Sequence, residues 1–197
     1  MNRRDYLDAR ERALNSLKRA IEEGKADSDI ISLLEVINRS EHMFTTSSCS
    51  GRIVIIEVPY PGAKPGATFL GKWHSEVTVD DVRDAIAKAK SGYLWFMVHP
   101  PIIHIVSDDI RMAERVVKAG LSSGFKNSGM RAASDKIVIE LRSTERMDVL
   151  LGKDKKLYFS EGYIKLLCET SNYMLKKGKD KLKMLREEIE KFISKIE

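Results

Sequence analysis

Apolar residues near the N-terminus recur with the period of an α-helix. A first amphipathic face runs up to Gly24, a residue type that commonly ends helices. A second face begins at Ile30 and repeats at i, i+3, i+4 and i+7, with Asp27 or Ser28 as its cap. The spacing therefore predicts two amphipathic helices before the first strand. The apolar positions of the first helix are Leu7, Leu14, Leu17 and Ile21.

The middle of the chain alternates between short apolar runs and helical segments. Runs of β-branched and aromatic residues predict buried strands, and a Pro- and Gly-rich stretch at residues 59–66 predicts a loop. Thr78 and Asp81 have the spacing of a capping box, which predicts a helix after them. A further helix is predicted after the aspartates at 108–109, ending near Gly120. The predicted strands are residues 53–56, 69–77, 93–98, 102–106 and 136–142.

The order of these elements indicates two mirrored half-units, at about residues 45–98 and about 101–143. Strand, strand, helix and strand are followed by strand, helix, strand and strand. In the C-terminal segment, residues 160–197, the pattern is helical, with a break or bend expected at Gly178. The sequence therefore predicts an α+β protein, a single domain over residues 1–197. Its mixed, largely antiparallel sheet or partial barrel would be flanked by N-terminal helices and a long C-terminal helix.

Composition narrows the class of protein. The chain has 43% hydrophobic and 32% charged residues, which is typical of a globular protein. No apolar run approaches the roughly 20 residues that a membrane-spanning helix needs, and the N-terminus lacks the apolar core of a signal peptide. Cys49 and Cys168 are too few for a disulfide framework, so we expect a reducing cytoplasm. The net charge is +5, most of it in residues 153–197, which is compatible with RNA binding.

Two segments rich in hydroxyl groups and small residues carry the candidate chemistry. The first hydroxyl-rich segment, residues 45–52, ends in Arg52 and leads directly into a predicted strand. The second hydroxyl-rich segment, residues 122–129, combines serines and glycines with Lys126. Hydroxyls donate and accept hydrogen bonds, and a guanidinium presents a rigid fork, so such segments suit a polar or anionic planar ligand. The alternative for the first segment is a solvated turn before a strand.

Five short motifs, taken together, resemble one family of tRNA-modifying enzymes. In this order along the chain, they are similar to those of the wybutosine-synthesising tRNA N4-methyltransferase family. The similarity extends from about Arg10 to about Glu190, nearly the whole chain. The motifs are Ser47-Ser48-Cys49-Ser50-Gly51-Arg52, Trp73-His74, Ile103-His104-Ile105, Gly124-Phe125-Lys126-Asn127-Ser128-Gly129 and Arg142-Ser143-Thr144.

The resemblance implies a specific reaction. A methyl group would pass from S-adenosylmethionine to N4 of 4-demethylwyosine, or of its 7-aminocarboxypropyl derivative, at position 37 of tRNA(Phe). His104 or His74 would accept the proton that the ring nitrogen loses. The resemblance assigns cofactor binding to Ser47, Ser48, Ser50, Gly51, Arg52, Asn127 and Ser128. It assigns substrate binding to Trp73, Phe125, Lys126 and Arg142, of which Trp73 or Phe125 would stack on the base. The division of the two segments between cofactor and tRNA stays open.

Other chemistries find little support in the sequence. The four histidines show neither the i, i+4 helical spacing nor the clustered Cys/His pattern of a zinc site, so we expect no metal. Because no G-x-G-x-x-G motif follows a strand, a doubly wound cofactor fold is not indicated either. A non-catalytic tRNA-binding module is the alternative function, and it would bind RNA without binding S-adenosylmethionine. The sequence leaves the oligomeric state and the natural wyosine intermediate open.

Overall fold

The computed structural model describes residues 2–132 and 136–194, and the chain forms two compact units that alternate along the sequence. Each unit contains its own antiparallel sheet and its own hydrophobic core. Residues 195–197, the end of the predicted C-terminal segment, lie outside the described residues. Unit 1 comprises Met1–Ser50, Pro101–Thr144 and Lys179–Glu197, and unit 2 comprises Gly51–Pro100 and Glu145–Gly178.

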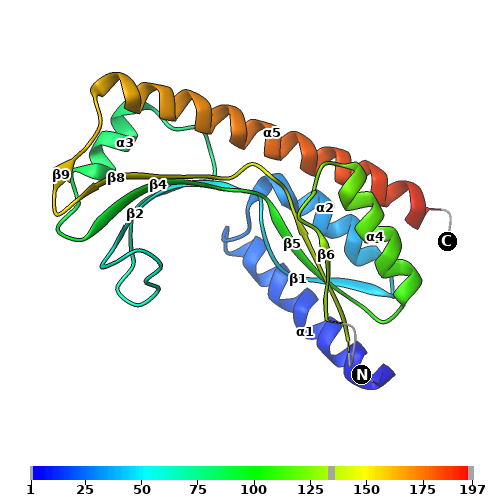
Figure 1. Cartoon of the computed structure of the whole chain (residues 1–197). Coiled ribbons are helices and arrows are strands. Elements are labelled where there is room, and N and C mark those ends of the chain that lie inside the picture. The colour runs from blue at the N-terminus through cyan, green and yellow to red at the C-terminus, as the bar shows by residue number, and fades with distance from the viewer. Residues whose placement is uncertain (1, 133–135, 195–197) are drawn as a thin grey trace. The chain divides into compact units, whose positions relative to one another are not determined.

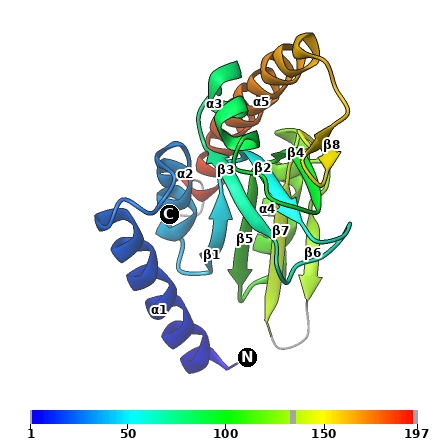
Figure 2. The same ribbon diagram turned by 90° about the vertical axis from the view of Figure 1, so that its left-hand side faces the viewer.

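Unit 1 is built on a four-stranded antiparallel sheet with the strand order β1-β5-β7-β6 (Figures 1 and 2). β1 and β6 are therefore its edge strands. The strands are β1 (Met43–Cys49), β5 (Ile102–Ser107), β7 (Ile137–Arg142) and β6 (Gly129–Ala132). The helices of this unit are α1 (Arg3–Glu22), α2 (Ser28–Arg39), α4 (Ile110–Ser122) and the C-terminal part of α5 (Glu161–Ile193).

The two faces of this sheet have different surroundings. Side chains alternate between the faces of a strand, and on β5 Ile103 and Ile105 face the main core, which is completed by α2, α4 and α5. Val106 faces the other way and packs with Phe44 and with Tyr6 of α1. By the same alternation, His104 lies on the face that α1 covers in part. One face of the sheet thus packs against the main core. The other face is covered by α1 in part and also carries polar side chains.

Unit 2 is built on a five-stranded antiparallel sheet with the strand order β3-β2-β4-β8-β9. Its core takes apolar residues from β2 and β4, from α3, and from the first part of α5. Thr78 and Asp81 form the expected capping box at the start of α3. The elements are β2 (Arg52–Val58), β3 (Thr68–Trp73), α3 (Val79–Ile86), β4 (Tyr93–His99), β8 (Met147–Lys153) and β9 (Lys156–Leu157).

The predicted α+β class is confirmed, with antiparallel strands, N-terminal helices and a long C-terminal helix. The strands form two sheets, and in the described part of the chain neither closes into a barrel. Since the compact units alternate along the chain, neither of them is a continuous half of it. The single-domain assignment and the internal duplication stay predictions.

Two predicted interruptions of helices, a break at Gly178 and an end at Gly120, are wrong. Gly178 does not break α5, which runs unbroken from Glu161 to Ile193. A single glycine costs a helix only about 1 kcal/mol, and the packed apolar stripes on either side of this position outweigh that cost. Gly120 does not end α4, which continues to Ser122. Its missing side chain lets the helix approach Leu141 of β7 closely.

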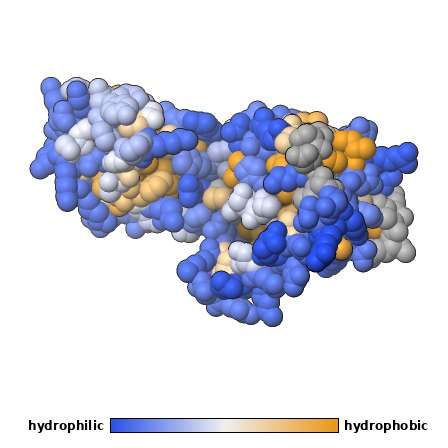
Figure 3. All heavy atoms as spheres, turned by 90° about the horizontal axis from the view of Figure 1, so that it is seen from below, coloured by the Kyte–Doolittle hydropathy of each residue, from blue (hydrophilic) through white to orange (hydrophobic). Residues whose placement is uncertain are grey.

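One face of the molecule is shown with its hydropathy in Figure 3. Hydrophilic residues cover most of the face seen in Figure 3, and apolar side chains appear there in smaller patches. Among the residues that the structure describes, no helix has the length and apolar character needed to cross a membrane.

Candidate functional site

The first hydroxyl-rich segment is a strand for most of its length. Residues 45–49 belong to β1, and a bulge interrupts the pairing of β1 with β5 between Thr45 and Ser48. Thr45 is buried and exchanges two hydrogen bonds with the Asn38 side chain of α2, at 2.8 and 2.9 Å. A bulge re-aims the side chains next to it, and Ser47 at this bulge is exposed. One of the hydroxyls therefore holds the strand to α2 while another faces outwards.

Ser47 bonds to the predicted catalytic histidine. Its Oγ lies 3.0 Å from Nδ1 of His104, and Nε2 of His104 lies 3.2 Å from Oε2 of Glu140. His104 and Glu140 are direct partners in the register of β5 and β7. The other carboxylate oxygen of Glu140 accepts a 2.6 Å hydrogen bond from Arg131 of β6. The four strands β1, β5, β7 and β6 thus each contribute one side chain to a continuous series of hydrogen bonds.

The charge of Glu140 determines which nitrogen of His104 carries a proton. The hydrogen bond from Arg131 lowers the pKa of Glu140 below its usual value, burial opposes this shift, and His104 reinforces it. Glu140 is therefore an ionised carboxylate, which only accepts hydrogen bonds. In a neutral His104 the proton accordingly sits on Nε2, and Nδ1 accepts the hydroxyl proton of Ser47. The basic nitrogen of His104 faces Ser47.

A cavity of about 240 Å³ lies next to Ser47, at one end of this series of hydrogen bonds. Ser47 and Ser48 line this cavity. Ser47 therefore connects the cavity with His104, to which it is hydrogen-bonded. Its lining comes from α1, the turn after α1, α2 and β1, all in unit 1. The full set is Ser16, Leu17, Ala20, Lys25, Ala26, Asp27, Ile30, Leu34, Thr45, Thr46, Ser47 and Ser48.

Ser50 is a structural residue and not a surface contact. Its backbone N–H and its hydroxyl both donate to Oδ2 of Asp27, at 2.9 and 3.2 Å, and its side chain is fully buried. Asp27 is the N-cap residue of α2, yet its side chain makes no capping hydrogen bond. The prediction that the Ser50 side chain contacts the cofactor does not fit this burial. Ser50 instead joins the end of β1 to the start of α2.

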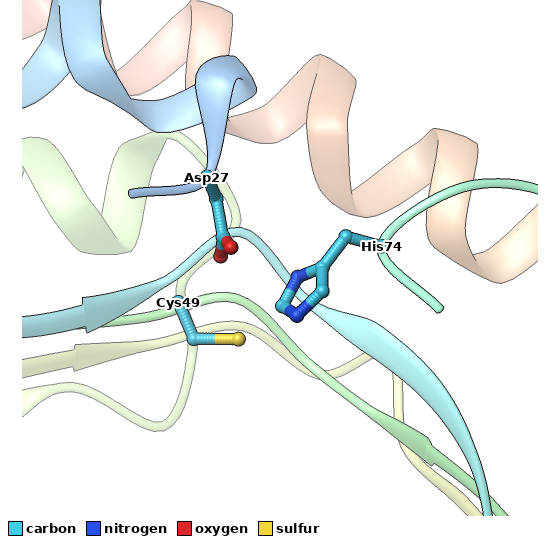
Figure 4. A group of neighbouring side chains, drawn as sticks. All are labelled: Asp27, Cys49 and His74. Atoms are coloured by element: carbon cyan, nitrogen blue, oxygen red, sulfur yellow. The ribbon is translucent and has the colours of Figure 1, made fainter. Parts of the chain in front are cut away.

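The carboxylate of Asp27 also points towards the thiol of Cys49 in Figure 4. One of its oxygens and the Cys49 sulfur lie within 4.8 Å of each other. Neither Cys49 nor Cys168 forms a disulfide. His74, which Figure 4 also labels, belongs to unit 2 and is half-buried.

The second hydroxyl-rich segment is a turn held against the end of β7. The backbone N–H of Asn127 donates to the carbonyl of Arg142, and Oγ of Ser128 accepts from the N–H of Arg142. The same Ser128 hydroxyl donates to the Phe125 carbonyl at 2.6 Å. Lys126 reaches back to the Leu121 carbonyl at 2.7 Å. Ser128 and Lys126 therefore serve the turn itself, while Asn127 is exposed.

Phe125 does not fit its predicted role. Its side chain has no exposed surface and lies in the core of unit 1, so a base cannot stack on it. Phe125, the aromatic residue of the second hydroxyl-rich segment, is therefore a core residue.

In unit 2, Arg52 is oriented by a histidine that the sequence did not single out. Nε of Arg52 donates to Nδ1 of His99 at 3.2 Å, and the two residues are register partners on β2 and β4. The guanidinium also lies over the ring of Phe69, 5.6 Å from its centre. Burial, followed by the charge of Arg52, lowers the pKa of His99 below its usual value. A neutral His99 can accept from Arg52 and so fix its direction.

Gly51 and Trp73 complete the predicted residues of unit 2. Gly51 has a φ of 95°, a conformation that side-chain-bearing residues rarely adopt. Trp73 is half-buried, and its ring lies over Gly71, where a Cβ atom would come within 2.0 Å of it. The Trp73 ring is thus partly packed in its own unit.

The predicted residues therefore fall into two groups. Unit 1 brings together Ser47, Ser48 and His104, while unit 2 holds Gly51, Arg52, Trp73 and His74. Sequence reasoning missed Glu140, Arg131 and His99. A glutamate between two apolar residues of a strand signals an outward-facing position, but its partner depends on strand register, which the sequence does not show.

Comparisons with known proteins agree with the resemblance. The family model described as methyltransferase TYW3 matches residues 8–191, and the chain belongs to this methyltransferase family. A tRNA(Phe) 7-((3-amino-3-carboxypropyl)-4-demethylwyosine(37)-N(4))-methyltransferase 1 of Thermococcus kodakarensis is 45% identical over 188 residues, which are 95% of each chain. The protein of the same name in Pyrococcus furiosus is 45% identical over 187 residues, covering 94% of this chain and 95% of that protein.

Solved structures show the same fold. The PH1069 protein of Pyrococcus horikoshii has a TM-score of 0.89 and 44% identity, covering 93% of this chain and 95% of that one. A hypothetical protein of Aeropyrum pernix has a TM-score of 0.75 and 27% identity, covering 85% of this chain and 99% of that one.

Proposed function

We propose that this protein transfers a methyl group from S-adenosylmethionine to N4 of the 4-demethylwyosine-type base at position 37 of tRNA(Phe). Membership of a methyltransferase family and the printed names of relatives that are 45% identical over nearly the whole chain support this reaction. The structural observation that carries it is His104, held between Glu140 and Ser47, of which Ser47 lines a cavity. A tRNA-binding module without catalysis would have no use for a histidine poised in this way.

The residues of unit 1 fit part of the proposed cofactor. S-adenosylmethionine carries an amino acid, a ribose and a base, and hydroxyl groups can donate to and accept from all three. The cavity offers such hydroxyls from Thr46, Ser47 and Ser48 of β1. Arg52 and Asn127 keep their predicted roles as cofactor contacts in this proposal. When bound, the cofactor supplies an electrophilic methyl group on a sulfonium.

The protein then has two tasks, orientation and proton removal. Holding two reactants in line can supply about 7–11 kcal/mol of the barrier reduction, so the residues around the cavity act mainly by position. The acceptor nitrogen must also lose a proton as its bond to the methyl group forms. Nδ1 of His104 is the proposed acceptor, either directly or through the Ser47 hydroxyl that bonds to it. Glu140 stabilises the imidazolium that results.

The proposed function is tested by methyl transfer to two tRNA preparations. Radiolabelled S-adenosylmethionine is incubated with tRNA whose base 37 stops at the demethylated tricyclic stage, and with fully modified tRNA. Label in the precursor alone, located at N4 by mass spectrometry of the nucleoside, is the expected result. Absence of label in a preparation that binds the precursor tRNA would overturn the proposal and favour the binding module.

The role of His104 is tested in the same assay. Replacing His104 by Gln should lower kcat by about 10²- to 10⁴-fold, the usual contribution of a general base. His42→Gln is a matched control, since His42 is an exposed histidine of the same unit that pairs with Asp108. Equal activity of the two variants would remove His104 from the mechanism.

A further inference from the structure

The cavity beside Ser47 has one apolar and one polar wall. Leu17, Ala20, Ile30 and Leu34 come from α1 and α2, and residues 45–48 bring the hydroxyls of β1. A ligand that fits such a cavity has a short hydrocarbon part and a strongly polar end. The lining also includes residues of both charges, Lys25 and Asp27.

The volume limits the size of the ligand. Pockets that hold a whole drug-sized molecule measure roughly 300–1,000 Å³, and this cavity measures about 240 Å³. It is therefore too small for a complete nucleoside derivative but large enough for one arm of it. An arm with two or three methylene groups and a charged end matches both the size and the two-sided lining.

The charged residues indicate what that end carries. Lys25 is 74% exposed and pairs with Glu23 at 2.6 Å. Such an exposed ion pair contributes little to stability, so the ammonium can exchange Glu23 for a ligand carboxylate at little cost. The carboxylate of Asp27, which carries the opposite charge, is held in place by two hydrogen bonds from Ser50. A cation and an anion in the lining of one cavity suit a zwitterion.

We propose that this cavity binds the α-amino-acid end of a ligand, with Lys25 on its carboxylate, Asp27 on its ammonium and Ser48 donating a hydrogen bond. This proposal rests on the proposed function, which brings two such groups to the protein. One is the methionine part of the methyl donor. The other is the 3-amino-3-carboxypropyl side chain of the base that the relatives' names print. The two groups share the same chemistry, and binding experiments separate them.

The donor is tested with two ligands that differ in the amino acid alone. S-adenosylhomocysteine keeps the amino-acid end, and 5′-methylthioadenosine lacks it. If the donor occupies the cavity, Lys25→Met weakens binding of S-adenosylhomocysteine by about threefold to fivefold, as expected for a lost exposed ion pair, and leaves 5′-methylthioadenosine unchanged. Calorimetry measures both affinities directly, without any methyl transfer.

The acceptor is tested with two tRNAs that differ in the side chain alone. If the base occupies the cavity, Lys25→Met raises KM about threefold to fivefold for tRNA with the aminocarboxypropyl group and leaves KM for tRNA with plain 4-demethylwyosine unchanged. Lys18→Met is the matched control in both experiments, because Lys18 is an exposed lysine of α1 outside this cavity. Ser48→Ala should change the same ligand as Lys25→Met.

A Lys25→Met protein with unchanged binding in both experiments would overturn the assignment of the cavity. That outcome is distinct from failure of the proposed function, which would appear as no methyl transfer by the wild-type protein. Because Lys25 is exposed, its replacement should not change the stability of the fold. Equal melting temperatures of Lys25→Met and Lys18→Met verify this.

Discussion

At the scale of single residues, Glu140 gives His104 its direction. Two strands that pair in antiparallel fashion bring their side chains opposite one another, and β5 and β7 do so for His104 and Glu140. The carboxylate is 15% exposed and also bonds to Arg131. An ionised carboxylate on one ring nitrogen leaves the other nitrogen as the base. We therefore regard Glu140 as a positioning residue for the proposed proton acceptor.

Replacing Glu140 by Gln tests this role. The amide is nearly the same size but carries no charge, and it can donate to His104 as well as accept, so the tautomer of the ring is no longer fixed. We expect kcat for methyl transfer to fall by roughly tenfold to a hundredfold, with little change in KM for the cofactor. Steady-state kinetics with precursor tRNA measure both constants.

The matched control for this variant is Glu190→Gln, which removes an exposed carboxylate that pairs with Arg39 and Arg186 in the same unit. It should leave kcat unchanged. A drop in kcat that is accompanied by an equal rise in KM and a large loss of melting temperature would show that Glu140 is merely structural.

A second residue-scale effect concerns the pH dependence of stability. The pKa of His99 is lowered in the folded protein, whereas in the unfolded chain it is about 6.5. The unfolded state therefore binds more protons below about pH 6.5, so stability falls as the pH drops from 6.5 towards the folded-state pKa. Above pH 6.5 both states are neutral at this position and the effect is absent.

Replacing His99 by Asn should reduce this slope. The amide oxygen can still accept from Nε of Arg52, but Asn does not titrate. The midpoint of urea unfolding, measured from pH 7.5 to pH 5, should fall less steeply in the variant than in the wild type. An identical slope in both proteins would mean that His99 is not the group that resists protonation.

At the scale of secondary-structure elements, α4 approaches β7 through a glycine. A Cβ atom at Gly120 would lie 2.8 Å from Cδ2 of Leu141, whose side chain is fully buried. Ala is favoured over Gly in a helix by about 1 kcal/mol, whereas overpacking a core costs about 1–3 kcal/mol. The packing cost is larger than the gain in helix propensity. Glycine at this position therefore allows close packing of α4 on β7 and does not form a turn.

We therefore expect opposite effects from two glycine-to-alanine changes in helices. Gly120→Ala should lower the melting temperature by a few degrees, in line with a net cost of up to about 2 kcal/mol. Gly162 of α5 has no atom within 4 Å of the position of a Cβ, so Gly162→Ala should raise the melting temperature slightly. Differential scanning calorimetry gives both values, and a stabilised Gly120→Ala protein would contradict the packing argument.

The elements that the sequence predicted are those whose pattern is local. The capping box at Thr78 and the continuous apolar runs of β4 and β5 gave their elements directly. β1 was missed as a strand because serines and threonines on an edge strand leave no apolar alternation at its end. β9 has two residues and exists through its pairing with β8. Such strands depend on partners elsewhere in the chain.

The same limit applies to the candidate site. His104 was found through its resemblance to a family motif, but its partner Glu140 is 36 residues away along the chain. Only the register of β5 and β7 makes them neighbours. Likewise, the burial of Phe125 follows from the packing of α4 and α5 on the sheet, and a motif cannot show this.

At the scale of the whole molecule, part of the positive charge of the C-terminal segment is engaged within the protein. Two lysines of the basic C-terminal segment serve unit 1 itself. Lys179 pairs with Asp29 at 2.7 Å, and Lys181 donates to the Gly124 carbonyl and to Thr144. Contacts to the tRNA backbone must then come in part from other cations. Arg142, a predicted substrate contact, has a side chain that is 39% exposed at the end of β7.

The salt dependence of tRNA binding separates the possible roles of Arg142. A side chain that neutralises one phosphate releases counterions, so its loss reduces the slope of log affinity against log salt concentration by about one. We expect this for Arg142→Gln, measured by fluorescence anisotropy with labelled tRNA(Phe) at several salt concentrations. Arg186→Gln, which removes an exposed arginine of α5 paired with Glu190, is the control and should keep the wild-type slope. Because Nε of Arg142 also lies 3.8 Å from Glu140, the variant could instead lower kcat with an unchanged slope. That result would assign Arg142 to the support of His104 and contradict its assignment to the tRNA backbone.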